Sequence, residues 1–191
     1  MDNPHPLDTI RERRHQQYAM IIFLPQPLDA VIAPLRARFD PIYNLVSSHI
    51  TVVFPFETMM PIEEIASTVG AEIQKQPRIH IELDSIGDFY PKSPIIYWKI
   101  KKNNELCELY YRLYARLGVP IPHKIYEPHV TVAREISDHR VMIVKEKIVS
   151  YLPNEKFRAG SIDLVTPLVN EKWVSVRTFS LSENGDSSIA T

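Results

Sequence analysis

A short motif that occurs twice is the feature that most constrains what this chain can fold into. Residues 49–52 (HITV) and 129–132 (HVTV) each carry a histidine, a β-branched residue, a threonine and a valine in that order. With 7 histidines in 191 residues, chance gives roughly 0.3 His-x-Thr triplets. Two matched copies, 80 residues apart, therefore indicate a chain built from two related halves.

Proline and polar clusters divide the sequence into short elements that follow the same order in both halves. Hydrophobic patterns predict strands at residues 18–24, 48–56, 79–83, 95–100 and 128–133, a closing hairpin of residues 156–168 and 172–181, and helices at residues 28–39, 61–76, 104–117 and 137–152. The order is β-α-β-α-β followed by β-α-β-α-β-β, with the motif strand second in each half.

This order predicts an α+β protein with a pseudo-two-fold axis. Residues 18–181 are expected to form one bilobal domain, whose halves, residues 18–90 and 91–181, face each other across a cleft. The polar segment 1–17 is expected to be an N-terminal extension, and residues 182–191 a flexible tail.

The spacing within each motif puts both polar side chains on one face of a strand, because residues i and i+2 point the same way. His49 and Thr51 then project side by side, as do His129 and Thr131. Two histidines near neutral pH can supply a general base and a general acid, each worth about 10²–10⁴-fold in rate. Threonine hydroxyls can donate hydrogen bonds to phosphate oxygens, and no metal is required. The alternative is that each motif is only the polar face of a half-exposed strand.

The composition excludes several other kinds of site. The 5 glycines are scattered, so neither a G-x-G-x-x-G dinucleotide fingerprint nor a G-x-x-x-x-G-K phosphate loop can be drawn. The single cysteine, Cys107, excludes a disulfide framework and a cysteine-based zinc site. The polar N-terminus has no hydrophobic signal region, and the longest apolar run, residues 18–25, is too short to span a bilayer. We therefore expect a cytoplasmic protein that does not bind a membrane.

Basic residues are concentrated in one segment, although the net charge of −1 provides no overall attraction for nucleic acid. Between residues 92 and 134 there are three acidic residues and eight basic ones: Lys92, Lys99, Lys101, Lys102, Arg112, Arg116, Lys124 and Arg134. A solvated helix face accounts for Arg112 and Arg116. The others are candidates for a phosphate site.

The paired motifs resemble those of the two-histidine (2H) phosphoesterase superfamily, in its branch of bacterial 2'-5' RNA ligases and RNA 2',3'-cyclic phosphodiesterases. Residues 48–56 (SHITVVFPF) resemble the first motif of the family, and residues 126–134 (YEPHVTVAR) resemble the second. Valine stands at positions 52 and 132, where leucine is common in the family. The resemblance extends from about residue 18 to residue 181.

The resemblance implies a LigT-like fold, in which two antiparallel-rich sheets line a central cleft and helices lie outside. It also implies a metal-independent phosphodiesterase without a cofactor. One of His49 and His129 would deprotonate the nucleophile and the other would protonate the leaving ribose oxygen, while Thr51 and Thr131 hold the phosphoryl oxygens. Which histidine is the base stays open.

The implied substrate is a 2',3'-cyclic phosphate on an RNA end or a nucleotide, and the reverse reaction would form a 2'-5' RNA linkage. DNA is not an expected partner, and a monomer is expected. Two alternatives remain: an enzyme for another cyclic phosphate, such as an ADP-ribose derivative, and a nucleotide- or RNA-binding module without useful turnover.

Four further residues are candidates for substrate binding. Arg134 and Lys124 could bind phosphate, and Tyr126 and Phe56 could stack on a base, with core packing as the alternative for both aromatic residues. Alternation along residues 95–100 places Tyr97 and Trp98 on opposite faces, so one of these two side chains could reach the cleft.

Overall fold

The structure, a computed structural model, describes residues 16–122 and 125–183. The predicted extension and tail therefore lie largely outside the described residues. The elements are β1 (Gln16–Phe23), α1 (Gln26–Phe39), β2 (His49–Thr58), α2 (Ile62–Gln74), β3 (Ile79–Asp88), β4 (Ile96–Ile100), α3 (Asn104–Leu117), β5 (His129–Ala133), the 3-10 turn η2 (Asp138–Arg140), α4 (Val141–Val149), β6 (Glu155–Ala159), β7 (Ser161–Pro167) and β8 (Trp173–Ser180).

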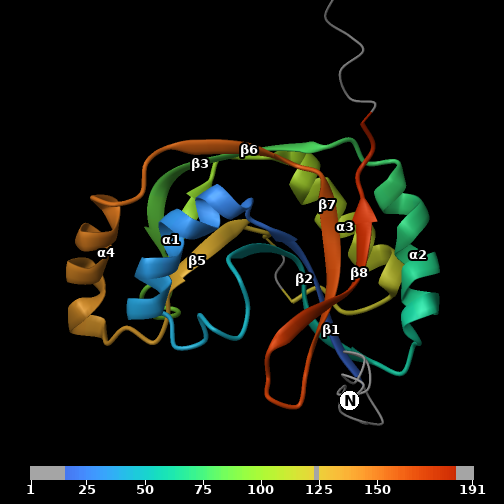
Figure 1. Ribbon diagram of the computed structural model, residues 1–191, viewed down its shortest axis with the longest axis horizontal. Helices are drawn as coiled ribbons and strands as arrows, with labels where there is room; N and C mark the ends of the chain where they lie inside the picture. The colour runs from blue at the N-terminus through green and yellow to red at the C-terminus, as the bar shows by residue number, and fades with distance from the viewer. Residues whose placement is uncertain (1–15, 123–124, 184–191) are drawn as a thin grey trace, which may run out of the picture.

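The strands form one curled antiparallel sheet, in the order β6-β3-β4-β5-β2-β1-β7-β8 (Figure 1). The α+β class and the bilobal LigT-like architecture predicted from the sequence are confirmed, but the two expected sheets are joined into one. The two motif strands, β2 and β5, make the join through the pair Ile50 and Val130. Because main-chain groups at an open sheet edge need partners, pairing these two strands removes an edge from the centre of the molecule.

Each side of this central join draws strands from both halves of the chain. We name β2, β1, β7 and β8 the β1 lobe, and β5, β4, β3 and β6 the β4 lobe. Strand β3, from the first half, pairs with β4 and β6, whereas β7, from the second half, pairs with β1. Strand β3 of the first half and strand β7 of the second half are thus each placed in the lobe that contains the other half's motif strand.

The predicted strand at residues 156–168 was wrong in one respect, because it is two strands that meet at Gly160. Strand β6 lies at one edge of the sheet beside β3, and β7 lies in the other lobe beside β1. The residues on both sides of Gly160 have strand-like patterns, so the sequence signal did not reveal the change of partner. The predicted hairpin is confirmed for β7 and β8.

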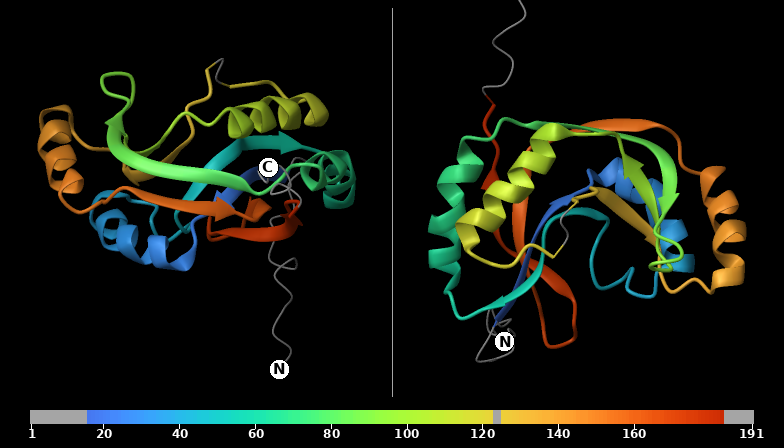
Figure 2. Two further views of the ribbon diagram at one scale, coloured as in Figure 1. Left: turned by 90° about the horizontal axis from the view of Figure 1, so that it is seen from above. Right: turned by 180° about the vertical axis from the view of Figure 1, so that it is seen from behind.

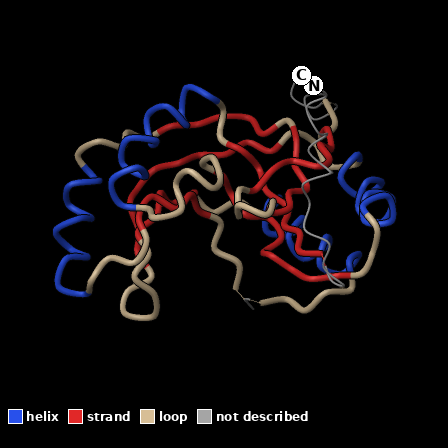
Figure 3. Tube along the Cα trace, turned by 60° about the horizontal axis from the view of Figure 1, so that its bottom comes forward, coloured by secondary structure: helices blue, strands red, loops and turns tan. Residues whose placement is uncertain are grey.

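The helices form two groups, with α1 on the side of α4 and α3 on the side of α2 (Figure 2), and the strands lie between the two groups (Figure 3). Helix α1 contacts β5, and α3 contacts β2, so each helix contacts the motif strand of the other half. Helix α3 has the predicted bounds and ends at Gly118, whose φ of 66° suits glycine. The predicted helix at residues 137–152 is instead the turn η2 followed by the short α4, and Ser137 makes no side-chain capping bond.

One face of the sheet is covered by the helices and holds the main core. Ile50, Val52, Val130 and Val132 are all fully buried in it. The motif histidines and threonines, on the opposite face, are half-buried. Among the described residues, no helix is long and apolar enough to cross a membrane.

Candidate active site

The two motifs meet at the centre of the sheet, where β2 and β5 run antiparallel. Since Ile50 lies opposite Val130, this register places His49 opposite Thr131 and Thr51 opposite His129. Directly opposed residues in such a pair have Cβ atoms about 4.5–5.5 Å apart, and diagonal residues are about 7–8 Å apart. Each histidine therefore stands beside the threonine of the other motif, and the two imidazoles occupy diagonal corners.

Both imidazoles are held in the same way by the main chain. His49 Nδ1 lies 2.8 Å from the carbonyl oxygen of Ser47, and His129 Nδ1 lies 2.7 Å from the carbonyl oxygen of Glu127. A carbonyl oxygen only accepts hydrogen bonds, so Nδ1 carries the proton in both rings. Proton exchange with a substrate would then take place at Nε2 of each ring.

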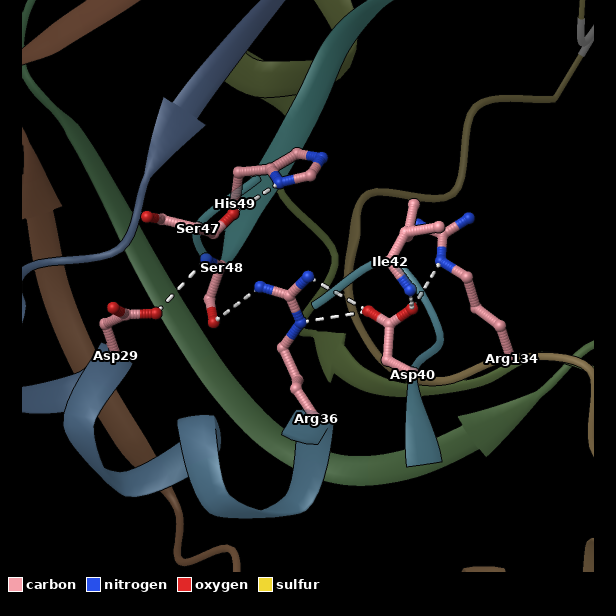
Figure 4. A network of polar contacts seen from close by, with 8 residues as sticks. All are labelled: Asp29, Arg36, Asp40, Ile42, Ser47, Ser48, His49 and Arg134. Atoms are coloured by element: carbon pink, nitrogen blue, oxygen red, sulfur yellow. Dashed lines mark hydrogen bonds and ion pairs between the residues drawn. The ribbon is translucent and has the colours of Figure 1, made fainter. Parts of the chain in front are cut away.

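A network of buried polar residues supports the segment that leads into His49 (Figure 4). Asp29 Oδ1 accepts a hydrogen bond from the main-chain nitrogen of Ser48 at 3.1 Å, and Arg36 Nη1 donates one to Ser48 Oγ at 3.2 Å. Arg36 also binds Asp40 Oδ2 through Nε at 3.0 Å and Nη2 at 2.9 Å. Helix α1, which carries Asp29 and Arg36, thereby fixes the position of His49.

The part of this network formed by Arg36, Asp40 and Arg134 has an excess of positive charge. Arg134, directly after β5, places Nε 3.3 Å from Asp40 Oδ1, so that two guanidinium groups share one fully buried carboxylate. The pKa of His49 is lowered to about 4, mainly by burial and also by Arg36, Arg134 and His129, against the opposing effect of the Ser47 carbonyl. Burial also lowers the pKa of Arg134, while Asp40 opposes this change. His49 is therefore neutral at pH 7.

Aromatic residues surround the second histidine. The rings of Phe89 and Tyr97 stack with centroids 4.4 Å apart, and both rings contact the imidazole of His129, at 5.0 and 4.9 Å. The Tyr97 hydroxyl donates a 2.7 Å hydrogen bond to Glu127 Oε1. Burial, followed by this hydrogen bond and the charge of Glu127, raises the pKa of Tyr97. Tyr97 pairs with Thr131 across β4 and β5, and half-buried Phe89 borders the site.

The predicted alternation of Tyr97 and Trp98 is confirmed, because Trp98 is fully buried in the helix-covered core. Glycine 87 makes room for the Tyr97 ring: a Cβ added there would lie 2.5 Å from Tyr97 Cζ. Phe89 was missed, since a single aromatic residue in a loop between strands carries no sequence signal. The spacing of Arg36 and Asp40, one helical turn apart, could have indicated a charged pair.

Tyr126 and Phe56 both make packing contacts, which was the alternative to base stacking. The Tyr126 ring stacks on Tyr110 at 4.1 Å in the core, and its hydroxyl donates to the main-chain oxygen of Thr51 at 2.7 Å. Phe56 packs against the core and lies five residues beyond Thr51 on β2, at about 3.3 Å per residue along a strand. Tyr126 therefore supports the first motif from behind, and Phe56 is far from both histidines.

The remaining two candidates have different outcomes. Arg134 lies near His49, as described above. Lys124 lies outside the described residues. Among the residues that the structure describes, no group of three His, Cys, Asp or Glu side chains could hold a metal ion.

Comparisons with known proteins agree with this geometry. The family described as "2'-5' RNA ligase superfamily" matches residues 24–171. A Bacillus pumilus protein named "Putative phosphoesterase" is 29% identical over 88% of this chain and 99% of its own length. A Geobacillus kaustophilus protein with the same description is 27% identical over 85% of this chain and 95% of its own length.

Solved structures share the fold. The crystal structure of LigT from E. coli complexed with 3'-AMP has a TM-score of 0.64 and 19% identity, covering 87% of this chain and 98% of that one. The structure of TT0787 from Thermus thermophilus has a TM-score of 0.61 and 17% identity, covering 86% of this chain and 97% of that one. The family match, residues 24–171, includes both motif strands.

Proposed function

The chain belongs to the 2'-5' RNA ligase superfamily, and from this premise we propose that it hydrolyses a 2',3'-cyclic phosphate at an RNA end or on a nucleotide. The observation that carries the proposal is the matched pair of imidazoles. Each ring has Nδ1 held by a carbonyl oxygen two residues earlier, and each stands beside the threonine of the other motif. A phosphate between them would meet an acid, a base and two hydroxyl donors.

In the proposed reaction, His49 acts as the base and His129 as the acid. His49 is neutral at pH 7 because it is partly buried beside two guanidinium groups, so its Nε2 can take a proton from water. The water oxygen forms a bond to phosphorus, and the bond from phosphorus to the ribose O3' breaks. Protonated His129 donates its Nε2 proton to O3', leaving a 2'-phosphate. Proton exchange with water then restores both rings.

The threonines and Arg134 would bind the phosphoryl oxygens. The hydroxyls of Thr51 and Thr131 can donate to the two non-bridging oxygens, on which charge develops. Arg134 Nε faces Asp40 in an ion pair without a hydrogen bond, and the side chain is 29% exposed. Its terminal nitrogens can therefore turn to a phosphate oxygen, where a charge-assisted hydrogen bond is stronger than a neutral one. The phosphate would neutralise the excess positive charge of the Arg36–Asp40–Arg134 group.

A ribose 5'-hydroxyl can take the place of water in the same step. If a ribose 5'-hydroxyl replaces water, His49 deprotonates it and a 2'-5' linkage forms. Hydrolysis and ligation then pass through similar transition states that differ in the attacking oxygen, and the competition between water and the 5'-hydroxyl of an RNA end decides the product.

The test is turnover of a 2',3'-cyclic nucleotide in the presence of EDTA. Activity should survive chelation and fall about 10²–10⁴-fold in both H49A and H129A. T51V and T131V should each lower kcat by about 10–10³-fold, since each removes one donor to the developing charge. H80A is the control, because His80 is exposed and lies near Glu82 on the β4-lobe surface.

Other results would identify another function. If the protein binds nucleotides but turns over no member of a substrate panel, it is a binding module and not an enzyme. Turnover of an ADP-ribose cyclic phosphate in preference to every RNA-derived substrate would keep the chemistry and change the substrate. Loss of activity with EDTA, restored by a divalent ion, would overturn the metal-independent mechanism.

A further inference from the structure

The two lobes present different side chains next to the paired histidines. On the β1 lobe, Phe23 lies opposite His49 across β1 and β2. On the β4 lobe, Lys99 lies opposite His129 across β4 and β5. Directly opposed residues point to the same face of a sheet, with Cβ atoms about 4.5–5.5 Å apart. Lys99 is therefore on the face of the catalytic pair, next to His129, and the equivalent position in the other lobe is apolar.

Lys99 differs from the other basic residues of the segment 92–134. Lys101 binds Glu82, both Arg112 and Arg116 bind Glu72, and Arg134 binds Asp40. Within the described part of the chain, Lys99 is exposed and has neither an ion pair nor a hydrogen bond. Lys92 and Lys102 are also exposed, but they lie outside the strands and are not opposite a motif residue.

Three carboxylates on or beside the β4 lobe are bound to other partners. Glu82 binds Lys101, Asp88 binds Lys145 at 2.7 Å, and Glu127 accepts the hydrogen bond from Tyr97. An ammonium group beside the active site that has no carboxylate of its own suits an anionic part of the substrate. Lysine binds phosphate as a compact point charge on a flexible stem.

The proposed acid role of His129 determines which part of the substrate faces Lys99. The acid protonates the leaving O3', so the ribose lies on the β4 lobe, and the attacking water lies on the side of His49. Phe89, half-buried beside His129, then offers an aromatic surface on which the nucleobase can stack. The 5' side of the same nucleotide would lie over β4.

We propose that Lys99 binds the phosphate on the 5' side of the terminal nucleotide, so that the protein prefers cyclic phosphates that carry this second phosphate. The inference rests on the proposed function and specifies its substrate class: an oligonucleotide end or a 5'-phosphorylated nucleotide, rather than a nucleotide with a free 5'-hydroxyl. Phe23 cannot bind phosphate, so the preference belongs to one lobe only.

The experiment compares two substrates that differ by one phosphate. Adenosine 2',3'-cyclic phosphate and its 5'-phosphorylated form are assayed with the wild-type protein, K99A and K99R. The matched control is K102A, which removes an exposed lysine that lies beyond the end of β4. The 5'-phosphate should raise kcat/KM about tenfold in the wild type, K99R and K102A, and less than about twofold in K99A, as expected for one hydrogen bond to a charged group.

The salt dependence gives a second measurement. For the phosphorylated substrate, log kcat/KM should fall with log salt concentration less steeply in K99A than in the wild type, by about 0.7 in the slope. This difference corresponds to one lost phosphate contact on a single strand. The slope for the substrate with a 5'-hydroxyl should not change between the wild type and K99A.

Two results would overturn the proposal for Lys99. Equal loss of kcat/KM on both substrates in K99A would place the lysine at the scissile phosphate, and an undiminished 5'-phosphate preference in K99A would place the second phosphate elsewhere. If the wild-type protein turns over neither substrate, the proposed function fails separately. The role of Lys99 is then decided by calorimetric binding of adenosine 2',5'-bisphosphate and adenosine 2'-phosphate. If Lys99 binds the second phosphate, the wild type should bind the bisphosphate about tenfold more tightly than adenosine 2'-phosphate, and K99A should lose this difference.

Discussion

At the scale of single residues, the two histidines share a main-chain anchor but not an electrostatic environment. His49 has the Arg36–Asp40–Arg134 group behind it, whereas His129 is in contact with the rings of Phe89 and Tyr97. A cationic environment disfavours an imidazolium ion, because like charges repel. The fold thereby distinguishes two side chains that the internal repeat would otherwise make equivalent.

The pH dependence of activity should reveal this difference. The acidic limb of kcat/KM reports the base of the free enzyme, and we expect it near pH 4, the pKa of His49, instead of near 6.5. Removing one cation in R36M should move the limb upward in pH, because protonation of His49 becomes easier. R116M, which changes an exposed arginine on α3, should leave the limb in place. An acidic limb at the same pH in R36M and in the wild type would contradict this account.

A second prediction at this scale concerns Gly87, which pairs with Tyr97 across β3 and β4. In G87A the new methyl group would lie 2.5 Å from Tyr97 Cζ, so the ring has to move. Such overpacking should cost about 1–3 kcal/mol of unfolding free energy and should disturb the contact between Tyr97 and His129. Thermal or urea unfolding measures the first effect, and cyclic-nucleotide turnover measures the second.

The control for G87A is another glycine with open space. G70A on α2 would bring its Cβ no closer than 3.8 Å to Phe179, and it should stabilise the helix by up to about 1 kcal/mol. The double variant G87A/Y97A should lose less stability than the two single changes together. Full additivity would show that the Tyr97 ring is not the obstacle.

Residue-level prediction from the sequence worked where a pattern repeats and failed where a position depends on distant contacts. The period of two placed His49 and Thr51 together and separated Tyr97 from Trp98. Tyr126 lies in the second motif, yet its ring is held by Tyr110 of α3, and no local pattern encodes that contact. A side chain's burial depends on which element packs over it, which the sequence of its own strand does not contain.

At the scale of elements, helix α1 connects the two motifs. It carries Asp29 and Arg36, which bind the segment before β2, and it is followed by Asp40, which binds Arg134 directly after β5. The main-chain oxygen of Phe39 also accepts a hydrogen bond from the nitrogen of Arg134 at 2.9 Å. One helix end therefore holds the start of one motif strand and the end of the other.

Substituting Asp40 should be strongly destabilising. D40N removes the carboxylate that Arg36 and Arg134 share, and leaving buried charges unpaired costs about 3–5 kcal/mol. Denaturant unfolding measures the loss. E72Q provides the comparison, since it also removes a carboxylate shared by two arginines, but those arginines are 42% and 58% exposed. Exposed pairs contribute at most about 1 kcal/mol, so equal losses in the two variants would contradict the role given to the buried group.

The elements themselves were largely predictable, because each is marked by local signals. Helix α3 has Asn103 as its N-cap, which accepts a hydrogen bond from the Leu106 nitrogen, and Gly118 at its end, so its bounds follow from sequence. The division between β6 and β7 was not predictable, because it reflects the choice of β3 or β1 as partner. Local sequence specifies extended backbone well, and partner choice depends on the whole sheet.

At the scale of the whole molecule, a single sheet fixes the spacing of the two histidines. Both are the first residues of their strands, and the strands are neighbours at the centre of the sheet. Helices α1 and α3 pack across the join, each against the other half's motif strand. A change in the distance between the imidazoles would therefore require the core behind Ile50 and Val130 to be repacked.

The stability of the whole fold should depend on pH through His49. Its pKa is about 4 in the folded protein and 6.5 in its unperturbed state, so the unfolded chain binds more protons between these values. The free energy of unfolding should therefore fall as the pH drops from 6.5 towards 4. In H49N this decline should be smaller, and urea unfolding at several pH values measures it. Identical pH profiles for the wild type and H49N would show that protonation of His49 is not linked to folding.

The exchange of β3 and β7 between the lobes has a consequence for a chain cut in two. A break in the turn between β3 and β4 would give one fragment with β1, β2 and β3 and another with β4 to β8. Four of the seven strand pairings would still join the fragments, namely β1–β7, β2–β5, β3–β4 and β3–β6. Each fragment carries one of the two motif histidines and incomplete parts of both lobes. The two pieces should therefore complement each other when they are produced together, and neither alone should form a catalytic centre.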